Sequence, residues 1–345
     1  MSWFGKKQPP PTRAPIHHAP PKLTLSLADA APVGVADNVL LLTERADPLP
    51  PDPAVSAPPP PAVKAAPPKA APSPLKAVAA DSYWTQTRID AAEFLWGEDN
   101  LGPGDGAIAA GALADLPITV ASQVLIASAG LGGLSRVLAR HYGCWPTSMT
   151  PSAALAGIAQ QRSDAAELSQ KAAVTAYDPA TAQFKANSFD IVAAHEILTP
   201  VANKARLMQQ IVRAAKRGGT VVITEMVMTE LGVASLGGTS RRSAAAGEAL
   251  QAWLKLMNPT PQLWSHAQMM ETFFSLNVDA ASKNISPAYV ERINKIWGEL
   301  SGKLEAGTIP RPLLPTVATD SERWAAFRTA LDEDAIAMTR YTIKI

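Results

Sequence analysis

Short apolar runs and stretches with helical spacing alternate along the chain beyond residue 120. Three short runs are apolar enough for buried strands, at residues 123–127, 189–193 and 220–225. Three stretches place apolar side chains three or four positions apart, as amphipathic helices do, at residues 134–142, 151–161 and 204–216. Strands that alternate with helices at such intervals form parallel sheets, because each helix returns the chain to the same edge. We therefore predict an α/β, Rossmann-like fold with a mostly parallel sheet and helices on both faces.

Weaker patterns extend this domain in both directions. Helices are predicted at residues 83–96 and 106–116, and a weaker strand at 143–149. The segment Arg217-Gly218-Gly219 is typical of a C-cap turn after the helix at 204–216. Residues 240–261 have an apolar face that includes Trp253, and residues 340–345 alternate like an antiparallel terminal strand at the sheet edge. The domain is thus expected at 81–345, with an insert near 230–265.

Residues 1–80 differ in composition from the rest. Of the 31 prolines in the chain, 19 fall in this segment, and aromatic residues are few. Proline fixes φ and lacks a backbone donor, so the segment favours extended conformations and cannot form a core. We predict a disordered Pro/Ala-rich arm at residues 1–80. Residues 22–42 within it are less polar, and are either a mildly apolar linker or a docking segment for a protein partner.

Charge and cysteine content exclude several classes of function. The formal net charge is +1, so no whole-molecule field attracts nucleic acid or an anionic membrane. The single cysteine, Cys144, excludes an internal disulfide, and we expect no metal site. No run approaches the roughly 20 apolar residues of a membrane span, and the N-terminal sequence lacks an apolar signal core. We expect a cytoplasmic protein that binds neither nucleic acid nor membrane.

Three sequence blocks resemble the class I S-adenosylmethionine-dependent methyltransferases, in particular their small-molecule branch. The blocks are VLIASAGLGGLSRVLARHYG (124–143), FKANSFDIVAAHEIL (184–198) and AAKRGGTVVITEMV (214–227). They are similar, in order and spacing, to the family's strand, glycine loop and helix, its middle strand, and its glycine turn with the strand that follows. The segment Trp96-Gly97-Glu98, followed by Gly102-Pro103-Gly104, is similar to the "Trp-Gly-Glu-Gly… Pro-Gly-Gly" lead-in of sarcosine/dimethylglycine and phosphoethanolamine methyltransferases. The resemblance implies S-adenosylmethionine as cofactor.

The implied cofactor motifs depart from the family pattern. The family's loop reads Asp-x-Gly-x-Gly-x-Gly; here Ile126 replaces the acid and Ser128 the first glycine, while Gly130 and Gly132 are kept. The family's ribose acid ends the second strand, where this chain has Thr150. A carboxylate is the stronger, charge-assisted acceptor, and its loss costs about 1.5–3 kcal/mol, or roughly ten- to a hundredfold in affinity. The resemblance therefore implies a cofactor site at Ser128, Gly130, Gly132 and Thr150 with weakened affinity.

Two further positions are candidates with ordinary alternatives. Asp178-Pro179 matches the family's adenine-side acid, but an ordinary surface turn explains the pair equally well. His195-Glu196 follows the strand at 189–193, near the crevice where such sheets bind ligands. His195 is thus a weak catalytic candidate as a general base, while a polar pair at a strand end is the simpler interpretation.

Three functions remain open from the sequence. The two lost acids favour a degenerate methyltransferase-like protein with weak or no catalysis, which binds or scaffolds partners through its arm. The alternative is an active methyltransferase that acts on a small molecule, because an activated sulfonium mainly requires alignment of the reactants. In that case Thr150 and main-chain donors would hold the cofactor weakly, or a neighbouring carboxylate such as Asp164 or Glu167 would substitute for a missing acid in three dimensions. The third is a pocket for another nucleotide-like ligand.

Overall fold

A computed structural model describes residues 83–237 and 240–345 of the chain. The arm predicted at residues 1–80 lies outside the described residues. Within the described part, the strands form one seven-stranded sheet in the order β3-β2-β1-β4-β5-β7-β6. The strands are β1 (Val124–Ile126), β2 (Thr147–Thr150), β3 (Val174–Ala176), β4 (Phe189–His195), β5 (Ala215–Met228), β6 (Ala280–Asn284) and β7 (Ile336–Lys344).

Strand pairing confirms the predicted Rossmann-like sheet. Strands β1 to β5 pair in parallel, whereas β7 is antiparallel to both β5 and β6. The chain moves outward from β1 through β2 to β3, then returns to β4 on the other side of β1. The strand order therefore reverses between β1 and β4, and open α/β sheets bind ligands beyond the carboxyl ends of the strands at such a point.

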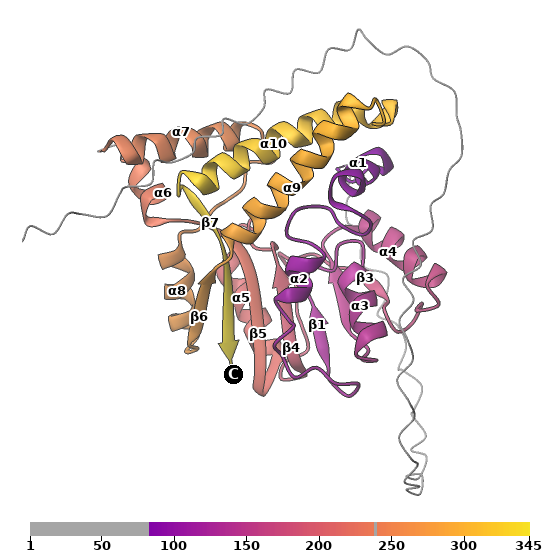
Figure 1. Cartoon of the computed structure of the whole chain (residues 1–345). Helices are drawn as coiled ribbons and strands as arrows, with labels where there is room; N and C mark the ends of the chain where they lie inside the picture. Colours follow the sequence, from indigo (N-terminus) through magenta and orange to yellow (C-terminus); the bar gives the residue numbers. More distant parts are fainter. Residues whose placement is uncertain (1–82, 238–239) are drawn as a thin grey trace, which may run out of the picture. The chain divides into compact units, whose positions relative to one another are not determined.

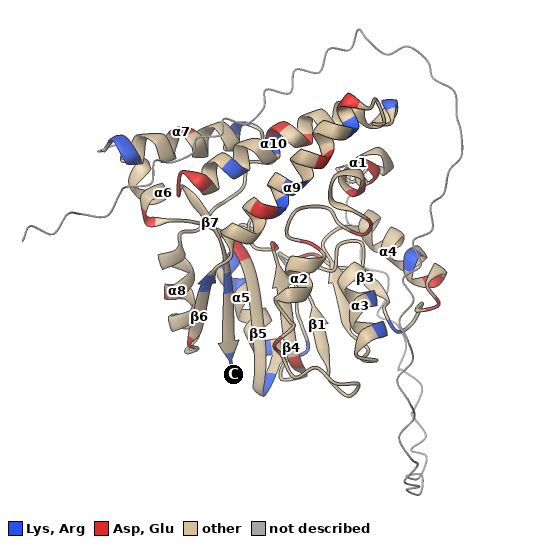
Figure 2. Cartoon of the chain, viewed as in Figure 1, with Lys and Arg blue, Asp and Glu red and all other residues tan. Residues whose placement is uncertain are grey.

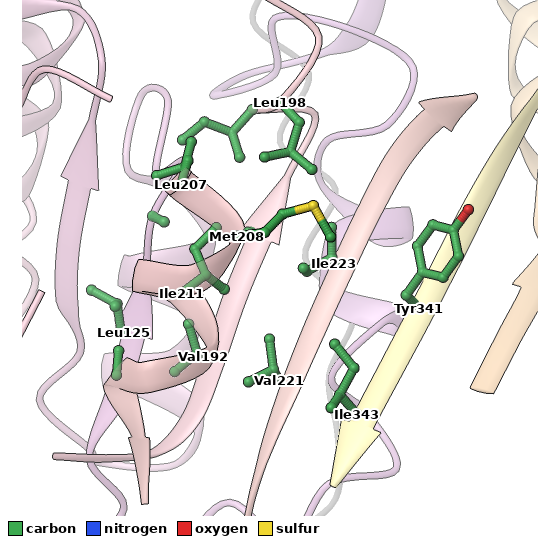
Figure 3. Packing of buried hydrophobic residues seen from close by; sticks show 14 of the residues in the cluster. Leu125, Val192, Leu198, Leu207, Met208, Ile211, Val221, Ile223, Tyr341 and Ile343 are labelled. Atoms are coloured by element: carbon green, nitrogen blue, oxygen red, sulfur yellow. The ribbon is translucent and has the colours of Figure 1, made fainter. Parts of the chain in front are cut away.

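Helices cover both faces of the sheet and its carboxyl edge (Figure 1). On one face α5 (Lys204–Ala214) and α8 (His266–Ser275) pack on the sheet. The buried cluster beneath them includes Leu125, Val192 and Ile223 (Figure 3). On the other face lie α2 (Ala107–Gly111), α3 (Gly133–His141) and α4 (Ala153–Ala165). Two-faced burial explains why the central strands are continuous apolar runs.

A separate cluster of helices lies beyond the carboxyl ends of the parallel strands (Figure 1). These helices are α1 (Gln86–Trp96), α6 (Glu230–Ser235), α7 (Arg241–Lys255), α9 (Ser286–Glu305) and α10 (Leu314–Asp332), with a short 3-10 helix at Arg311–Leu313 before α10. Trp253 of α7, Tyr289 of α9 and Phe327 of α10 are each at most 2% exposed and form its core. The cluster therefore has its own apolar core above the sheet edge.

Several sequence predictions need correction. The terminal strand is antiparallel as predicted, but β6 pairs with its outer side, so β7 is not an edge strand. Residues 217–219 are not a turn: α5 ends at Ala214, and β5 starts at once, with Gly218 at φ +79° and its N–H bonded to the carbonyl of Ile345. No elements were predicted between residues 262 and 339, where α8, β6, α9 and α10 lie. The apolar side chains of α9 and α10 pack on other helices and not on the sheet. These two helices therefore stand outside the alternation of strands and helices from which the other elements were predicted.

Candidate functional site

Two cavities open at the carboxyl ends of β1, β2 and β4. The inner cavity, of about 340 Å³, lies between α2, α3 and the sheet, and Ile126, Ala193 and Val222 contribute apolar side chains to its lining. The aromatic cavity, of about 520 Å³, extends from the end of β2 to α7 and α10. Both are in the size range of small-molecule sites. They share lining residues (Asp105, Ser128, Gly130 and His195), so they adjoin where the strand order reverses.

The loop after β1 tolerates its serine without backbone strain. Gly130 and Gly132 have φ values of +52° and +79°, in the region that favours glycine, whereas Ser128 is not among the residues with positive φ. The hydroxyl of Ser128 accepts a hydrogen bond from the backbone N–H of His195, at 2.7 Å. Ser128 thus ties the loop to the end of β4, and it does so without a backbone conformation that would require glycine.

The positions of the two lost acids lie beside the cavities. Ile126, 1% exposed, ends β1 and lines the inner cavity. Thr150, also 1% exposed, ends the adjacent parallel strand β2 and lines the aromatic cavity. Asp164 and Glu167 line neither cavity within the described part of the chain. The substitutions therefore bear directly on the site, and those two carboxylates do not replace the missing acids.

A cluster of titratable side chains lies at the end of β4. Nε2 of His195 is 3.1 Å from Oε1 of Glu196, and the hydroxyl of Tyr289 donates to the same oxygen at 2.7 Å. The His195–Glu196 contact has ion-pair length without good hydrogen-bond geometry, so Nε2 keeps its hydrogen-bonding capacity. Glu196 also has φ +49°, which is uncommon for a non-glycine residue. Backbone conformations of this kind are found more often at functional sites than elsewhere.

Burial and mutual charge perturb the pKa values of this cluster. Burial lowers the pKa of His195, but the Glu196 carboxylate, with Asp105 and Glu225 further away, outweighs it and the net pKa is raised. Burial raises the pKa of Glu196, but His195 and the Tyr289 hydroxyl outweigh it and the net pKa is lowered. Burial raises the pKa of Asp105, and His195 only partly opposes this. Such perturbed groups in a cavity mark candidate functional residues.

The loop between α1 and α2 closes tightly over this cluster. A Cβ atom on Gly104 would lie 2.5 Å or less from the polar ends of His195, Glu196 and Tyr289. The neighbouring Asp105 anchors the loop, because its Oδ2 accepts the backbone N–H groups of Leu101 and Gly102 at 2.7 and 3.2 Å. A side chain at position 104 would therefore displace the loop or the cluster.

The outer wall of the aromatic cavity is apolar and aromatic. It includes Trp253, Trp324 and Phe327, whose rings make edge and tilted contacts with centroids 5.4 and 5.8 Å apart. Nε1 of Trp324 is buried and makes no hydrogen bond to the described residues. Of the described residues that line this cavity, only His195 and Arg323 can carry a positive charge, and Arg323 already contacts Asp320 and Tyr83.

Acidic residues occur at the strand ends and in the loops at this end of the molecule, where Figure 2 colours parts of the ribbon red, while the helices above carry both acidic and basic residues. Among the acidic residues, Glu225 is 2% exposed and binds the N–H of Leu198 at 2.7 Å and the hydroxyl of Thr199. Glu225 thus holds the loop that carries the cavity residues after β4.

The sequence-predicted site residues divide into two groups. The structure brings together Ser128, Gly130, Thr150 and His195 around the cavities. Gly132 shapes the loop but lines neither cavity, and within the described residues Asp178 and Pro179 line neither cavity either. Both Asp178 oxygens are engaged in an exposed turn, with the N–H of Ala180 and the hydroxyl of Thr181. The proposed adenine-side role of Asp178 and Pro179 stays a prediction.

Sequence reasoning missed Asp105, Tyr289, Trp324 and Phe327. Tyr289 and the two aromatic residues of α10 come from helices that were not predicted, more than 90 residues beyond His195. For Asp105 the sequence did contain a signal. It directly follows Gly102-Pro103-Gly104, at the position where the lead-in motif Pro-Gly-Gly has its last glycine.

Residues 125–223 match the model of a protein family described as a methyltransferase domain. This part of the chain is similar to a methyltransferase domain. The matched residues run from β1 into β5 and include the glycine loop, the end of β2 and the His195–Glu196 pair. A search of the described residues finds no group of three or more His, Cys, Asp or Glu side chains placed to hold a metal ion. No described helix is long and apolar enough to cross a bilayer.

Two curated relatives match part of this chain in sequence. The phosphoethanolamine N-methyltransferase of Plasmodium falciparum is 25% identical over 157 residues, which are 45% of this chain and 58% of that protein. The chloroplastic tocopherol O-methyltransferase of Arabidopsis thaliana is 29% identical over 131 residues, 38% of this chain and 34% of that protein. The chain thus matches between a third and three fifths of the length of these relatives.

Solved structures share the fold of this chain. The phosphoethanolamine N-methyltransferase 2 of Haemonchus contortus, solved with phosphomonomethylethanolamine and S-adenosylhomocysteine, superposes with a TM-score of 0.62 at 19% identity. That match covers 76% of this chain and 59% of the other. A protein described as a sarcosine dimethylglycine methyltransferase from Galdieria sulphuraria gives 0.59 at 13% identity, covering 74% of this chain and 97% of that one. At these identities the likeness establishes the fold alone.

Proposed function

We propose that the chain is an active S-adenosylmethionine-dependent methyltransferase that acts on a small amine. The observation that carries the proposal is the junction of two cavities at Ser128, Gly130 and His195, beyond the carboxyl ends of β1 and β4 in the matched domain. The lost acids at Ile126 and Thr150 favoured a degenerate protein on sequence grounds. The geometry favours the active alternative, because the loop, the crevice and a group of perturbed titratable residues are all in place.

The residues around the junction fit a nucleoside-containing cofactor. Gly130 allows close approach of a ligand to the backbone, and the hydroxyl of Ser128 is engaged with β4 and ties the loop to it. The side chain of Thr150 lines the aromatic cavity beside the N-terminus of α4, where Ser152 caps the helix. We expect Thr150 to contact the ribose hydroxyls with one weak hydrogen bond where a carboxylate would make two strong ones.

When bound, S-adenosylmethionine would supply a methyl group activated by its positively charged sulfur. The chain's own residues would then align a nucleophile with that methyl group and exclude water. Trp253, Trp324 and Phe327 offer aromatic faces that attract a cation by about 0.5–2 kcal/mol. Glu196 adds a carboxylate on the inner side of the same cavity. A wall of this kind suits an ammonium group.

We propose that His195 removes a proton from the substrate nitrogen. Methylation by the bound cofactor would leave the product nitrogen positively charged, with a proton to lose. The amine proton passes to Nε2 of His195 and then to solvent. Nε2 has the free hydrogen-bonding capacity for this role, and the Glu196 carboxylate stabilises the charged imidazolium that forms.

The charge of the cavity also indicates which amines fit best. Arg323 is the only described lining residue with a permanent positive charge, and it is already paired with Asp320. A phosphate on the substrate would therefore lack a free cationic partner. The buried, unpartnered indole N–H of Trp324 would instead suit a neutral oxygen acceptor such as a hydroxyl group. We expect unphosphorylated amino alcohols to be better substrates than phosphoethanolamine.

An isotope-transfer assay tests this function. The purified full chain would be incubated with S-adenosylmethionine carrying a labelled methyl group and with ethanolamine, its mono- and dimethyl derivatives, and phosphoethanolamine. We expect label in at least one unphosphorylated product, and a His195→Gln variant that binds the cofactor but transfers much less. If the wild-type chain neither binds S-adenosylmethionine nor transfers label to any amine, the methyltransferase proposal is wrong and a binding or scaffolding role becomes the better one.

A further inference from the structure

The inner cavity lacks a carboxylate at the strand end where the family's loop carries one. Ile126 occupies that position and packs with the core side chains Val124, Leu138 and Ala193. The cofactor of the proposed reaction carries an amino-acid group with a positively charged α-ammonium. Without a partner for that charge, the cavity would bind the cofactor poorly, because a desolvated cation needs a hydrogen-bonded counter-charge.

Among the residues that the structure describes, four acidic ones line the two cavities, and three of these are engaged or exposed. Asp99 is held by Arg136 and Arg162, at 2.5 and 2.8 Å. Glu196 is engaged with His195 and Tyr289, and Glu98 is exposed to solvent. Asp105 is the fourth, and it is the acid that lines both cavities.

The Asp105 carboxylate has one oxygen to offer to a ligand. Its Oδ2 accepts the N–H groups of Leu101 and Gly102, while Oδ1 accepts no hydrogen bond from the described residues. The backbone around it is clamped by Arg292, whose guanidinium donates to the carbonyl of Asp105 and, at 2.9 Å, to that of Trp96. A carboxylate held in this way loses little conformational entropy when it binds, which favours affinity.

We propose that Asp105 accepts the α-ammonium group of S-adenosylmethionine and so replaces the acid that is absent at Ile126. The inference rests on the proposed function and deepens it. A carboxylate–ammonium hydrogen bond is charge-assisted and is among the stronger polar contacts in proteins. Asp105 is also a departure of this chain from the lead-in motif. The motif ends in Pro-Gly-Gly, whereas this chain has Pro103-Gly104-Asp105, so the aspartate replaces the last glycine.

Three ligands separate this contact from the others in the site. S-adenosylmethionine and S-adenosylhomocysteine both carry the α-ammonium, and only the first carries the sulfonium. 5′-Methylthioadenosine has the same nucleoside but no amino-acid group. Calorimetric dissociation constants of the full chain for all three would be compared with those of Asp105→Asn, whose amide oxygen can still accept the N–H groups of Leu101 and Gly102.

We expect Asp105→Asn to weaken the binding of S-adenosylmethionine and S-adenosylhomocysteine by about ten- to a hundredfold. The dissociation constant for 5′-methylthioadenosine should stay unchanged. Asp115→Asn, the same change at an exposed acid that lines neither cavity, should leave all three constants unchanged. Glu98→Gln tests the rival acid in the inner cavity.

Each other result overturns the inference in a distinguishable way. Equal weakening of all three ligands by Asp105→Asn would mean that the loop is disturbed as a whole. A loss confined to S-adenosylmethionine would place the carboxylate at the sulfonium, and an effect of Glu98→Gln instead would assign the contact to Glu98. If Asp105→Asn binds like the wild type, the inference fails while the proposed function stands. If the wild type binds none of the ligands, both fail.

Discussion

Replacing Gly104 with alanine should disturb the candidate catalytic cluster while leaving the identity of every side chain in the cluster unchanged. The added Cβ would lie at 2.5 Å or less from Nε2 of His195, Oε1 of Glu196 and the hydroxyl oxygen of Tyr289. Tyr289 cannot retreat, because its ring is 1% exposed in the core of the helical cluster. Either the loop moves away or the His195–Glu196 pair is pushed apart.

The size of the effect follows from the packing. Overpacking a site of this kind costs about 1–3 kcal/mol, and each kcal/mol lowers the melting temperature by about 2–4 °C in a domain of this size. A displacement of about 1 Å at a catalytic group can reduce the rate about a hundredfold. We therefore expect Gly104→Ala to lower both the melting temperature and methyl transfer, and to shift the pKa of His195 in an NMR titration.

Gly102 provides the matched control two residues earlier in the same loop. A Cβ there would meet the ring of Trp324 at 3.5 Å, an ordinary van der Waals contact. Gly102→Ala should keep the wild-type melting temperature and the wild-type pKa of His195. If the two alanine variants are indistinguishable in both measurements, the close packing of the loop on the cluster is refuted.

Four further predictions follow from the same geometry. Thr150→Asp should tighten S-adenosylmethionine binding about ten- to a hundredfold in a titration. Thr147→Asp, at the exposed start of the same strand, should leave the binding unchanged. Equal effects of the two variants would count against a contact between Thr150 and the ribose. If neutral His195 is the base, the transfer rate should rise with pH through a pKa above the ordinary value of about 6.5. Glu196→Gln should move that pKa of His195 downward, because burial is then opposed only by the more distant Asp105 and Glu225; an unmoved NMR titration curve would contradict the pairing. Glu225→Ala should cost about 1–3 kcal/mol by leaving buried donors unpaired and should raise the substrate KM; unchanged unfolding and KM would exclude its role in holding the loop.

The parts of the fold that sequence predicted share one property. The segment from β1 to α3 and the strands β4 and β5 each have a local pattern, an apolar run or a helical face with a glycine turn, that reports their burial directly. The paired strand β6 has four exposed residues out of five, so hydrophobicity does not mark it. Its place is decided by hydrogen bonds to β7, which is far away in the sequence.

The site was predictable at its strand ends and unpredictable elsewhere. Motif comparison located Ser128, Gly130 and Thr150, but it could not show that Ser128 avoids positive φ and that its cost is therefore small. The sequence marked Asp105 only as a replacement of the last glycine of the lead-in motif. Tyr289 reaches Glu196 across 93 positions of sequence, and no local spacing encodes such a contact.

The binding of S-adenosylmethionine to the purified wild-type chain, measured by isothermal titration calorimetry, tests the central claim most directly. We predict saturable binding at one site that S-adenosylhomocysteine competes away. Absence of binding, with a dissociation constant weaker than about 1 mM, would contradict the claim that the cavities at the ends of β1, β2 and β4 form a working cofactor site.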